Sequence, residues 1–234
     1  MTVSVPVSGK FPARVDLIIF DCDGVLIDSE YLACSSIVET FAGYGVTVPI
    51  DLLLSRLTGV TDKSLPDQLE TLGYAIPDAA YRRLEASILE KFRTALLPIA
   101  EMASLLEDLA VRICVASNSS VKRLDLSLGV TDLARFFGPN VFSADHVARG
   151  KPDPALFLYA AERMSVPPEN CLIVEDSTHG LAAARAAGIA ALGFHGGSHC
   201  RPDHGEVLLR NGALATFPRA RDLRRFLSKY VTAT

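Results

Sequence analysis

The chain has 234 residues, of which 49% are hydrophobic and 21% charged, an ordinary globular composition that suits one large domain or a core with a smaller companion. A net charge of -4 offers no basic surface for nucleic acid, and no run approaches the roughly 18 consecutive apolar residues of a membrane span. Residues 1–14 lack the apolar centre of a signal peptide, so we expect a soluble, cytoplasmic protein without a nucleic-acid or membrane partner.

Short apolar runs rich in β-branched residues recur along the chain and predict strands. They cover residues 15–20, 111–117, 140–143, 171–175, 190–194 and 213–217. Helical patterns lie between most of them, at 100–110, 120–129, 154–164, 178–188 and 204–212. This alternation predicts an α/β fold with a parallel sheet covered by helices on both faces. In such sheets ligands bind at the carboxyl ends of the strands.

One interval interrupts the alternation of strands and helices. Residues 29–97 contain no convincing strand, and their patterns indicate helices separated at glycines and a proline. The simplest interpretation is a helical cap domain inserted after the first strand. The α/β core domain would then comprise residues 1–28 and 98–234.

The first predicted strand ends in two carboxylates, Asp21 and Asp23, followed by Gly24. Side chains two residues apart on a strand point to the same side, so both acids are expected to face the cleft, while the glycine lets the backbone turn. Such a pair can hold a divalent cation, perform acid–base chemistry, or combine a nucleophile with an acid. The structural alternative is a strand end followed by an ordinary turn.

Three further strand ends carry polar residues. Ser117 and Asn118 could form an anion site or simply cap a helix, and Lys151 lies on a proline-stiffened loop where it could hold a phosphate. Glu175 and Asp176 could complete a metal site or cap the following helix. Four carboxylates around one cleft require a cation, and their hard oxygens suit Mg²⁺.

The same segments occur in the motif order of a known family. "DCDGVLIDSE" (21–30), "SN" (117–118), "KPDP" (151–154) and "EDSTHG" (175–180) resemble the four motifs of the haloacid dehalogenase superfamily, in its branch with a helical cap. The resemblance implies a Rossmann-like core, Mg²⁺ as cofactor, and hydrolysis of a small phosphorylated metabolite, a sugar phosphate or a sugar-acid phosphate. It also fits a monomer or a weak homodimer.

The resemblance assigns roles to individual residues. Asp21 would be the nucleophile that forms an aspartyl-phosphate, and Asp23 the acid and then the base. Ser117, Asn118 and Lys151 would hold the phosphoryl oxygens, with Lys151 also neutralising the nucleophile.

The resemblance also implies a set of ligands for Mg²⁺. These are the carboxylate of Asp21, the backbone carbonyl of Asp23, and Asp176, with Glu175 bound directly or through water. Asp23 further favours phosphate-ester chemistry, because the dehalogenases and the phosphonate-cleaving relatives lack an acid at that position.

Two alternatives stay open for the function. A β-phosphoglucomutase-type phosphoryl-transfer enzyme would carry a histidine twelve residues after the nucleophile, where this chain has Ala33. A non-catalytic binding relative would have lost Asp21 or Asp23, and both are present.

Substrate selection is expected from the cap. The candidate residues are Glu30, Arg56, Gly59, Thr61 and Lys63, most of them in the loop "RLTGVTDKS" (56–64). For any single one of Arg56, Thr61 and Lys63, an ordinary helix or loop position is the favoured interpretation.

Cysteines and histidines give no clear metal motif. The five cysteines are odd in number and never paired as CxxC, so neither a disulfide framework nor a zinc ribbon is indicated, and a reducing cytosol fits. His195, His199, Cys200 and His204 superficially resemble zinc ligands, but their irregular spacing fits no zinc template well. We therefore interpret this segment as a loop at the rim of the site.

Overall fold

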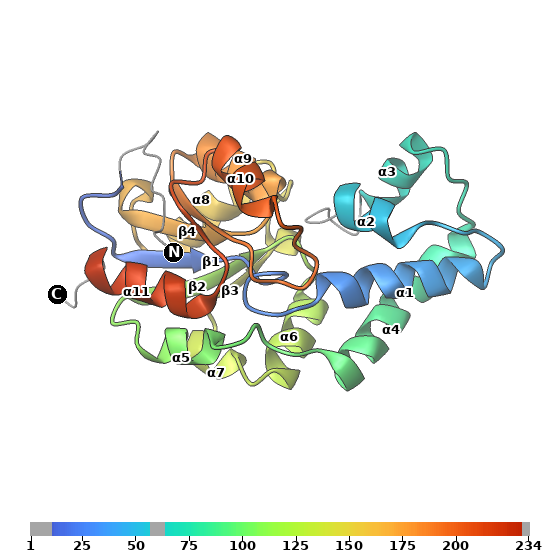
Figure 1. Cartoon of the computed structure of the whole chain (residues 1–234), viewed down its shortest axis with the longest axis horizontal. Coiled ribbons are helices and arrows are strands. Elements are labelled where there is room, and N and C mark those ends of the chain that lie inside the picture. The colour runs from blue at the N-terminus through green and yellow to red at the C-terminus, as the bar shows by residue number, and fades with distance from the viewer. Residues whose placement is uncertain (1–10, 57–63, 231–234) are drawn as a thin grey trace.

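The computed structural model describes residues 11–56 and 64–230, and a parallel sheet forms its centre (Figure 1). The sheet has six strands in the order β3-β2-β1-β4-β5-β6. They are β1 (Leu17–Phe20), β2 (Arg112–Ser117), β3 (Val141–Ser143), β4 (Cys171–Glu175), β5 (Ala190–Phe194) and β6 (Thr216–Phe217). All neighbouring strands are parallel, which confirms the predicted fold class. The chain reverses direction across the sheet at β1, where parallel sheets open a crevice for ligands.

Helices cover both faces of this sheet (Figure 1). One face carries α8 (Ala155–Arg163), α9 (Thr178–Ala187) and α10 (His204–Arg210), and the other carries α5 (Met102–Glu107), α6 (Val121–Val130), α7 (Ala134–Phe137) and α11 (Ala220–Tyr230). The alternation of β1 separates two apolar cores, because Leu17 and Ile19 belong to one and Ile18 and Phe20 to the other. All four β1 side chains are fully buried, as expected of a central parallel strand.

The segment of residues 29–97 is mainly helical in the part that the structure describes. It comprises α1 (Glu30–Ala42), α2 (Ile50–Arg56), α3 (Leu65–Thr71) and α4 (Asp78–Ala95), and it extends away from the sheet at the right of Figure 1. α1 packs along α4, with Phe41 and Tyr81 in edge-on contact at 5.5 Å between ring centroids. That this segment is a separate cap domain stays a prediction.

The chain enters and leaves the helical segment at one place. The amide of Asp28 donates to the carbonyl of Leu97 at 3.0 Å, and Ile27 and Pro98 form an antiparallel bridge. The two connections therefore run side by side beneath the helices.

Two helices of the core, α7 and α11, were not among the predicted elements. α11 places Leu223 and Leu227 four residues apart on one buried face, which is the spacing of an amphipathic helix. The last strand is also shorter than predicted, since only residues 216–217 pair regularly with β5.

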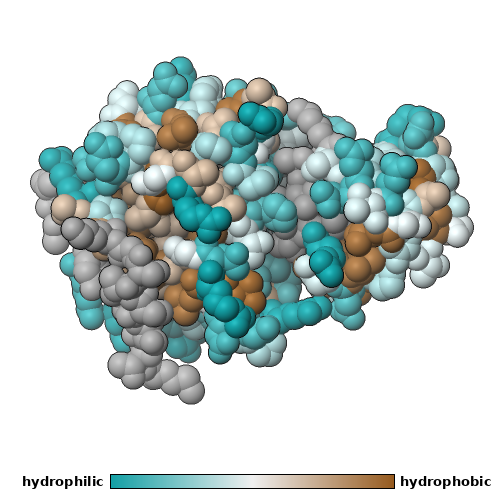
Figure 2. Space-filling view, turned by 90° about the horizontal axis from the view of Figure 1, so that it is seen from above, coloured by the Kyte–Doolittle hydropathy of each residue, from teal (hydrophilic) through white to brown (hydrophobic). Residues whose placement is uncertain are grey.

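Seen from above, the surface is largely hydrophilic with separate apolar areas (Figure 2). The large apolar side chains left exposed by the described residues come from several different elements: Tyr31, Tyr44, Leu97, Val121, Val130 and Leu158. Within the described ranges, no helix combines the length and the hydropathy that crossing a membrane requires.

Candidate active site

The carboxyl ends of β1, β2 and β4 bring the predicted polar residues to one edge of the sheet. Phe20 pairs in register with Val115 of β2 and with Val174 of β4. Asp21 therefore leaves the sheet next to Ser117, which ends β2, and next to Glu175, which ends β4. These segments are far apart in the sequence, and the parallel pairing of β1 with β2 and β4 brings them together.

Lys151 lies between two of the acids. Its Nζ is 2.8 Å from Oδ1 of Asp21 and 2.7 Å from Oε1 of Glu175, and all three side chains are buried. Burial opposes the charge of the lysine, but attraction and hydrogen bonds from the two carboxylates outweigh it and raise the pKa of Lys151 above its usual value. The lysine is therefore a fixed cation at the centre of the site.

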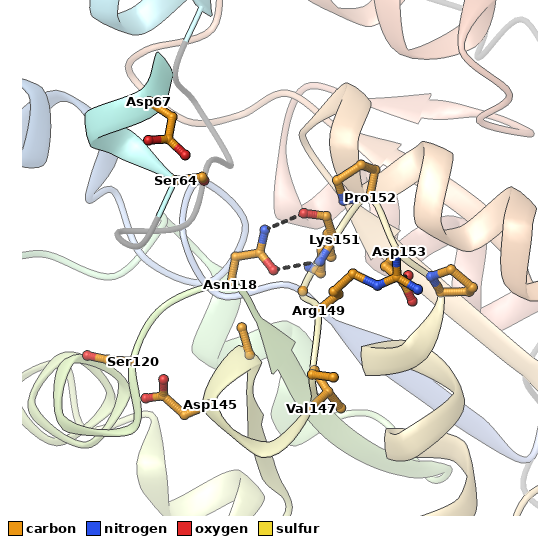
Figure 3. Close-up of a pocket in the computed structure, with 14 residues that line it drawn as sticks. Ser64, Asp67, Asn118, Ser120, Asp145, Val147, Arg149, Lys151, Pro152 and Asp153 are labelled. Atoms are coloured by element: carbon orange, nitrogen blue, oxygen red, sulfur yellow. Dashed lines mark hydrogen bonds and ion pairs between the residues drawn. The ribbon is translucent and has the colours of Figure 1, made fainter. Parts of the chain in front are cut away.

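Asn118 holds the main chain of Lys151. Its Oδ1 accepts from the Lys151 amide at 2.8 Å and its Nδ2 donates to the Lys151 carbonyl at 2.9 Å, as the dashed lines in Figure 3 show. A Cβ atom on Gly150 would lie 2.4 Å from Oδ1 of Asn118, so only glycine admits this contact without a shift. Asn118 and Lys151 line a pocket of about 770 Å³, and Ser64 of the helical segment lines it as well.

Three carboxylates gather on the other side of the lysine. Ligand oxygens of Asp21, Glu175 and Asp176 all lie within 4.8 Å of one another. Desolvation, followed by repulsion from Glu175, raises the pKa of Asp176. Desolvation also raises the pKa of Asp21, with Lys151 opposing and Glu175 adding to the shift. One lysine cannot balance three buried carboxylates.

A hard divalent cation fits this group. Oδ2 of Asp176 is buried and accepts no hydrogen bond from the described residues, which is a costly arrangement for an ionised carboxylate. Carboxylate oxygens are the preferred ligands of such cations. The acidic cluster is thus suited to a metal ion whose identity the donor set alone does not fix.

Glu175 is held in place by the start of α9. Its Oε2 accepts from the amide of Ser177 at 2.8 Å and from the Ser177 hydroxyl at 2.9 Å. A Cβ on Gly180 would lie 1.8 Å from Oε1 of Glu175, so the glycine makes room for the carboxylate. The "EDSTHG" segment therefore does more than cap α9: its serine and glycine hold the Glu175 carboxylate in place.

Asp23 occupies a separate environment. Its carboxylate accepts from the hydroxyls of Ser29 at 2.6 Å, Ser119 at 2.7 Å and Ser117 at 3.3 Å. β1 ends at Phe20, so the alternation of an extended strand does not place the two acids, contrary to our expectation. A tight turn does so instead, with Gly24 at a φ of 73°.

Comparison with known protein families agrees with this arrangement of the site. Residues 15–188 match the profile of the haloacid dehalogenase-like hydrolases, which covers more than half of the chain. The chain is a haloacid dehalogenase-like hydrolase. The recognised relatives include proteins named as phosphatases, and the hydrolase is accordingly a phosphoric monoester hydrolase.

Three similar proteins illustrate the match of this hydrolase. The 6-phosphogluconate phosphatase of Escherichia coli is 32% identical over 81% of this chain and 87% of its own length. A haloacid dehalogenase-like protein of unknown function from Agrobacterium tumefaciens aligns with a TM-score of 0.81, 33% identity, and coverage of 92% and 98% of the two chains. A putative β-phosphoglucomutase from Thermotoga maritima aligns with a TM-score of 0.72 and 27% identity over 92% and 99%.

The candidate specificity residues of the hydrolase are only partly described. Gly59, Thr61 and Lys63 lie outside the described residues. Arg56 is exposed at the end of α2 and lines a cavity of about 220 Å³ that Asp176 also lines. These contacts leave the role of each of the four residues a prediction.

Glu30 begins α1 and faces the site. Burial raises the pKa of Glu30 to about 8, with further contributions from Asp23, Asp176 and Asp21 and an opposing one from His199. The raised pKa favours the protonated form of this carboxyl group.

We expect Glu30→Gln to stabilise the metal-free protein in a pH-dependent way. A folded pKa near 8 against an unfolded value of 4.5 means that stability is lost as pH rises between these values. The variant escapes this loss, so its melting temperature in EDTA should exceed that of the wild type by about 2–4 °C at pH 8.5, or ~1 kcal/mol, with a smaller gain at pH 5. Glu39→Gln, at an exposed position of the same helix, is the control. A gain independent of pH would contradict the assignment.

Several contacts of the site were not found from the sequence. Ser29 and Ser119 bind Asp23, yet serines next to a motif carry no signal of their own. Nε2 of His199 lies 3.1 Å from Oδ2 of Asp176, a contact that no sequence pattern indicates.

We interpret the loop after β5 as part of the rim of the site. It does lie at the site, but His199, Cys200 and His204 bring their ligand atoms within 4.8 Å of one another despite the irregular spacing. His195 is not part of this group. Two turns, from Gly197 to Cys200 and from Arg201 to His204, bring the three side chains together although their spacing in the sequence is irregular.

Proposed function

We propose that this hydrolase is a Mg²⁺-dependent phosphatase that cleaves a small phosphorylated metabolite, a sugar phosphate or a sugar-acid phosphate, through an aspartyl-phosphate. The observation that carries the proposal is the buried pairing of Asp21 with Lys151 beside an acidic cluster that fits a divalent cation. A carboxylate kept in place by a lysine, with a cation position next to it, is the arrangement that nucleophilic attack on a phosphate needs.

Asp21 attacks the phosphorus in the first step. A bond forms between a carboxylate oxygen and phosphorus while the bond from phosphorus to the ester oxygen breaks, so the phosphoryl group moves to Asp21. Lys151 holds Oδ1 of Asp21 at 2.8 Å and orients the carboxylate for attack. The leaving alcohol departs with a proton supplied by Asp23.

Asp23 reverses its role in the second step. It takes a proton from a water molecule, whose oxygen attacks phosphorus and releases inorganic phosphate and free Asp21. Its neighbours Ser29 and Ser119 suit both states, because a hydroxyl can donate to a carboxylate or accept from a carboxylic acid. The hydroxyls thereby hold the group in place while its proton comes and goes.

Ser117 and Lys151 bind the phosphoryl oxygens in this proposal. Asn118 was assigned the same role, but both ends of its side-chain amide bind the main chain of Lys151. We infer that Asn118 acts mainly by positioning the lysine.

The cation would be held by Asp21 and Asp176, by the carbonyl of Asp23, and by Glu175 directly or through water. Mg²⁺ supplies positive charge that lowers the repulsion between carboxylate and phosphate and stabilises the transferred group. The unpartnered Oδ2 of Asp176 supports this assignment.

Residues 29–97 would act as a cap domain over this core. Their closure would exclude water until the ester is cleaved, and the five candidate specificity residues would select the substrate. The pocket of about 770 Å³ between Ser64 and Lys151 has room for a small metabolite; it reaches the site at Asn118 and Lys151, and the four carboxylates do not line it. The name of the Escherichia coli relative, a phosphatase of a sugar-acid phosphate, directs the choice of substrates to test.

The test measures phosphate release from p-nitrophenyl phosphate and from a panel of phosphorylated sugars and sugar acids, with Mg²⁺ and with EDTA. We expect release that depends on Mg²⁺ and favours one member of the panel. A binding protein without activity would release no phosphate from any of them, and this result would sink the proposal.

The likeness to the β-phosphoglucomutase structure supports one alternative. A mutase moves the phosphate between positions of one hexose and conserves organic phosphate, whereas a phosphatase liberates it. Ala33 on α1 replaces the histidine expected of a mutase and favours the phosphatase. Rearrangement of hexose phosphates without liberated phosphate would reverse this preference.

A further inference from the structure

The loop after β5 assembles a second group of metal-binding side chains. His199, Cys200 and His204 offer two imidazoles and one thiol, with ligand atoms within 4.8 Å of one another. The acidic cluster described above contains only carboxylates, whereas this group contains softer donors. The two groups lie next to each other, because Nε2 of His199 is 3.1 Å from Oδ2 of Asp176.

The spacing of these atoms is close to that of a tetrahedral site. Sγ of Cys200 lies 3.4 Å from Nε2 of His199, and that nitrogen is 3.1 Å from Oδ2 of Asp176. Neighbouring ligands of a tetrahedral zinc ion lie about 3.4–3.6 Å apart, given metal–ligand distances of about 2.0–2.3 Å. Two of the distances between neighbouring ligand atoms, from Nε2 of His199 to Sγ of Cys200 and to Oδ2 of Asp176, are therefore close to those of a tetrahedral site.

Asp176 lies between the acidic cluster and the group on the loop. Its Oδ2 is buried and has no hydrogen-bond partner among the described residues, although Nε2 of His199 lies 3.1 Å away. The side chain is only 1% exposed. A buried carboxylate oxygen beside an imidazole and without a hydrogen bond is unusual unless a cation joins the two groups.

The protonation of His204 suits metal binding. Its Nε2 lies 2.7 Å from the carbonyl oxygen of Asp176, and since a carbonyl only accepts, Nε2 must donate. Nδ1 of the neutral ring then carries the lone pair. Ligating histidines commonly donate their other ring N–H to a carbonyl or a carboxylate in this way.

The loop that carries these residues is anchored at the site. Oδ1 of Asp28 accepts from both the amide and the hydroxyl of Ser198 at 2.9 Å. A Cβ on Gly197 would come within 2.7 Å of the His199 ring, and a Cβ on Gly24 within 2.8 Å. Both glycines leave room for the imidazole.

We propose that His199, Cys200 and His204, with Oδ2 of Asp176, form a binding site for a thiophilic divalent metal of the zinc class. A thiolate and imidazoles select Zn²⁺ or Co²⁺ over Mg²⁺, which prefers oxygen ligands and octahedral geometry. Binding releases the thiol proton of Cys200 to solvent and forms a metal–sulfur bond, with no change of oxidation state.

The shared carboxylate gives this site a consequence for catalysis, which rests on the proposed function. A zinc-class ion on Oδ2 of Asp176 places a second positive charge beside the Mg²⁺ position. Zn²⁺ should therefore raise the Mg²⁺ concentration needed for half-maximal phosphate release.

The binding test uses the full chain stripped with EDTA, and Co²⁺ as a spectroscopic substitute for Zn²⁺. We expect a thiolate-to-cobalt band in the near ultraviolet with visible bands of tetrahedral intensity, both abolished by added Zn²⁺. Cys200→Ser should lose the near-ultraviolet band, and His204→Ala should weaken binding about tenfold or more. Cys171→Ser is the matched control, because Cys171 lies at the amino end of β4 and its thiol hydrogen bond to Pro167 is one that serine can also make.

A second measurement needs no variant. Cys200 is the one partly exposed cysteine of the five, so iodoacetamide should label it first. Zn²⁺ should slow this labelling about tenfold or more, and Mg²⁺ should leave it unchanged. Absence of a thiolate band in the wild type, its persistence in Cys200→Ser, or equal labelling with and without Zn²⁺ would each overturn the site. A Zn²⁺-insensitive Mg²⁺ requirement, with these signals present, would overturn only the coupling to catalysis.

Discussion

Asp21→Asn should abolish turnover, lowering phosphate release by on the order of 10⁴-fold or more, as loss of other covalent nucleophiles does. The amide keeps the shape of the side chain but cannot attack phosphorus. Its buried position carries a raised pKa, so removing the charge should leave the thermal stability of the metal-free protein equal or higher. The measurement is phosphate release together with the mass of acid-quenched protein, which should show a phosphoryl adduct only with Asp21 present.

Asp132→Asn is the matched control for this substitution. Asp132 is exposed, pairs with Arg135 far from the site, and has a φ of 59° that asparagine also adopts readily. It should retain full activity. Comparable activity in Asp21→Asn would show that another residue is the nucleophile.

Lys151→Met should damage both stability and catalysis. The substitution keeps most of the apolar stem of the side chain but removes the ammonium group, which lies between Asp21 and Glu175 and 4.8 Å from the centroid of the Phe157 ring. Breaking a buried ion pair costs about 3–5 kcal/mol, and losing a fixed donor to the reacting group costs about 10²–10³-fold in rate. We expect both effects at neutral pH.

The dependence of this deficit on pH and metal separates charge from packing. Without the lysine the folded carboxyls bind protons more tightly than the unfolded ones, so the loss of stability should grow as pH rises from 5 to 9. Mg²⁺ should recover part of it, because a cation replaces the missing charge. Urea unfolding in EDTA and in Mg²⁺ measures both, with Lys122→Met at an exposed ion pair as the control. A deficit that is constant with pH and insensitive to Mg²⁺ would point to packing instead.

The sheet and its polar edge could be read from the sequence because both depend on local patterns. The residues of β1 and β4 are continuous apolar runs, and each run ends in acids at the position where a parallel sheet opens. Parallel pairing then brings Asp21 and Glu175 together regardless of the chain between them. The sequence predicted that Lys151 lies on a stiff loop near the site. It did not predict the hydrogen bond to Asn118, because no sequence pattern indicates such a contact.

The contacts of Asp23 and Asp176 could not be read in this way. Ser119 is 96 residues from Asp23 and approaches it only because β2 is the neighbour of β1. His199 reaches Asp176 from the loop after β5, whose path depends on the anchor between Asp28 and Ser198. Such contacts arise from tertiary closure of loops, for which neither periodicity nor spacing gives a rule.

The paired connections at Asp28 and Leu97 have a mechanical consequence. The hydrogen bond of 3.0 Å and the bridge between Ile27 and Pro98 tie the two connections together, so we expect them to act as one hinge rather than as two independent ones. The exposed ion pair between Glu85 and Lys122 spans from α4 to the core, and such a pair holds by less than about 1 kcal/mol. Access to the acids would then be governed by a single coordinate. The opening and closing of the helical segment could be followed by measuring the distance between one spin label on α3 and another on α8.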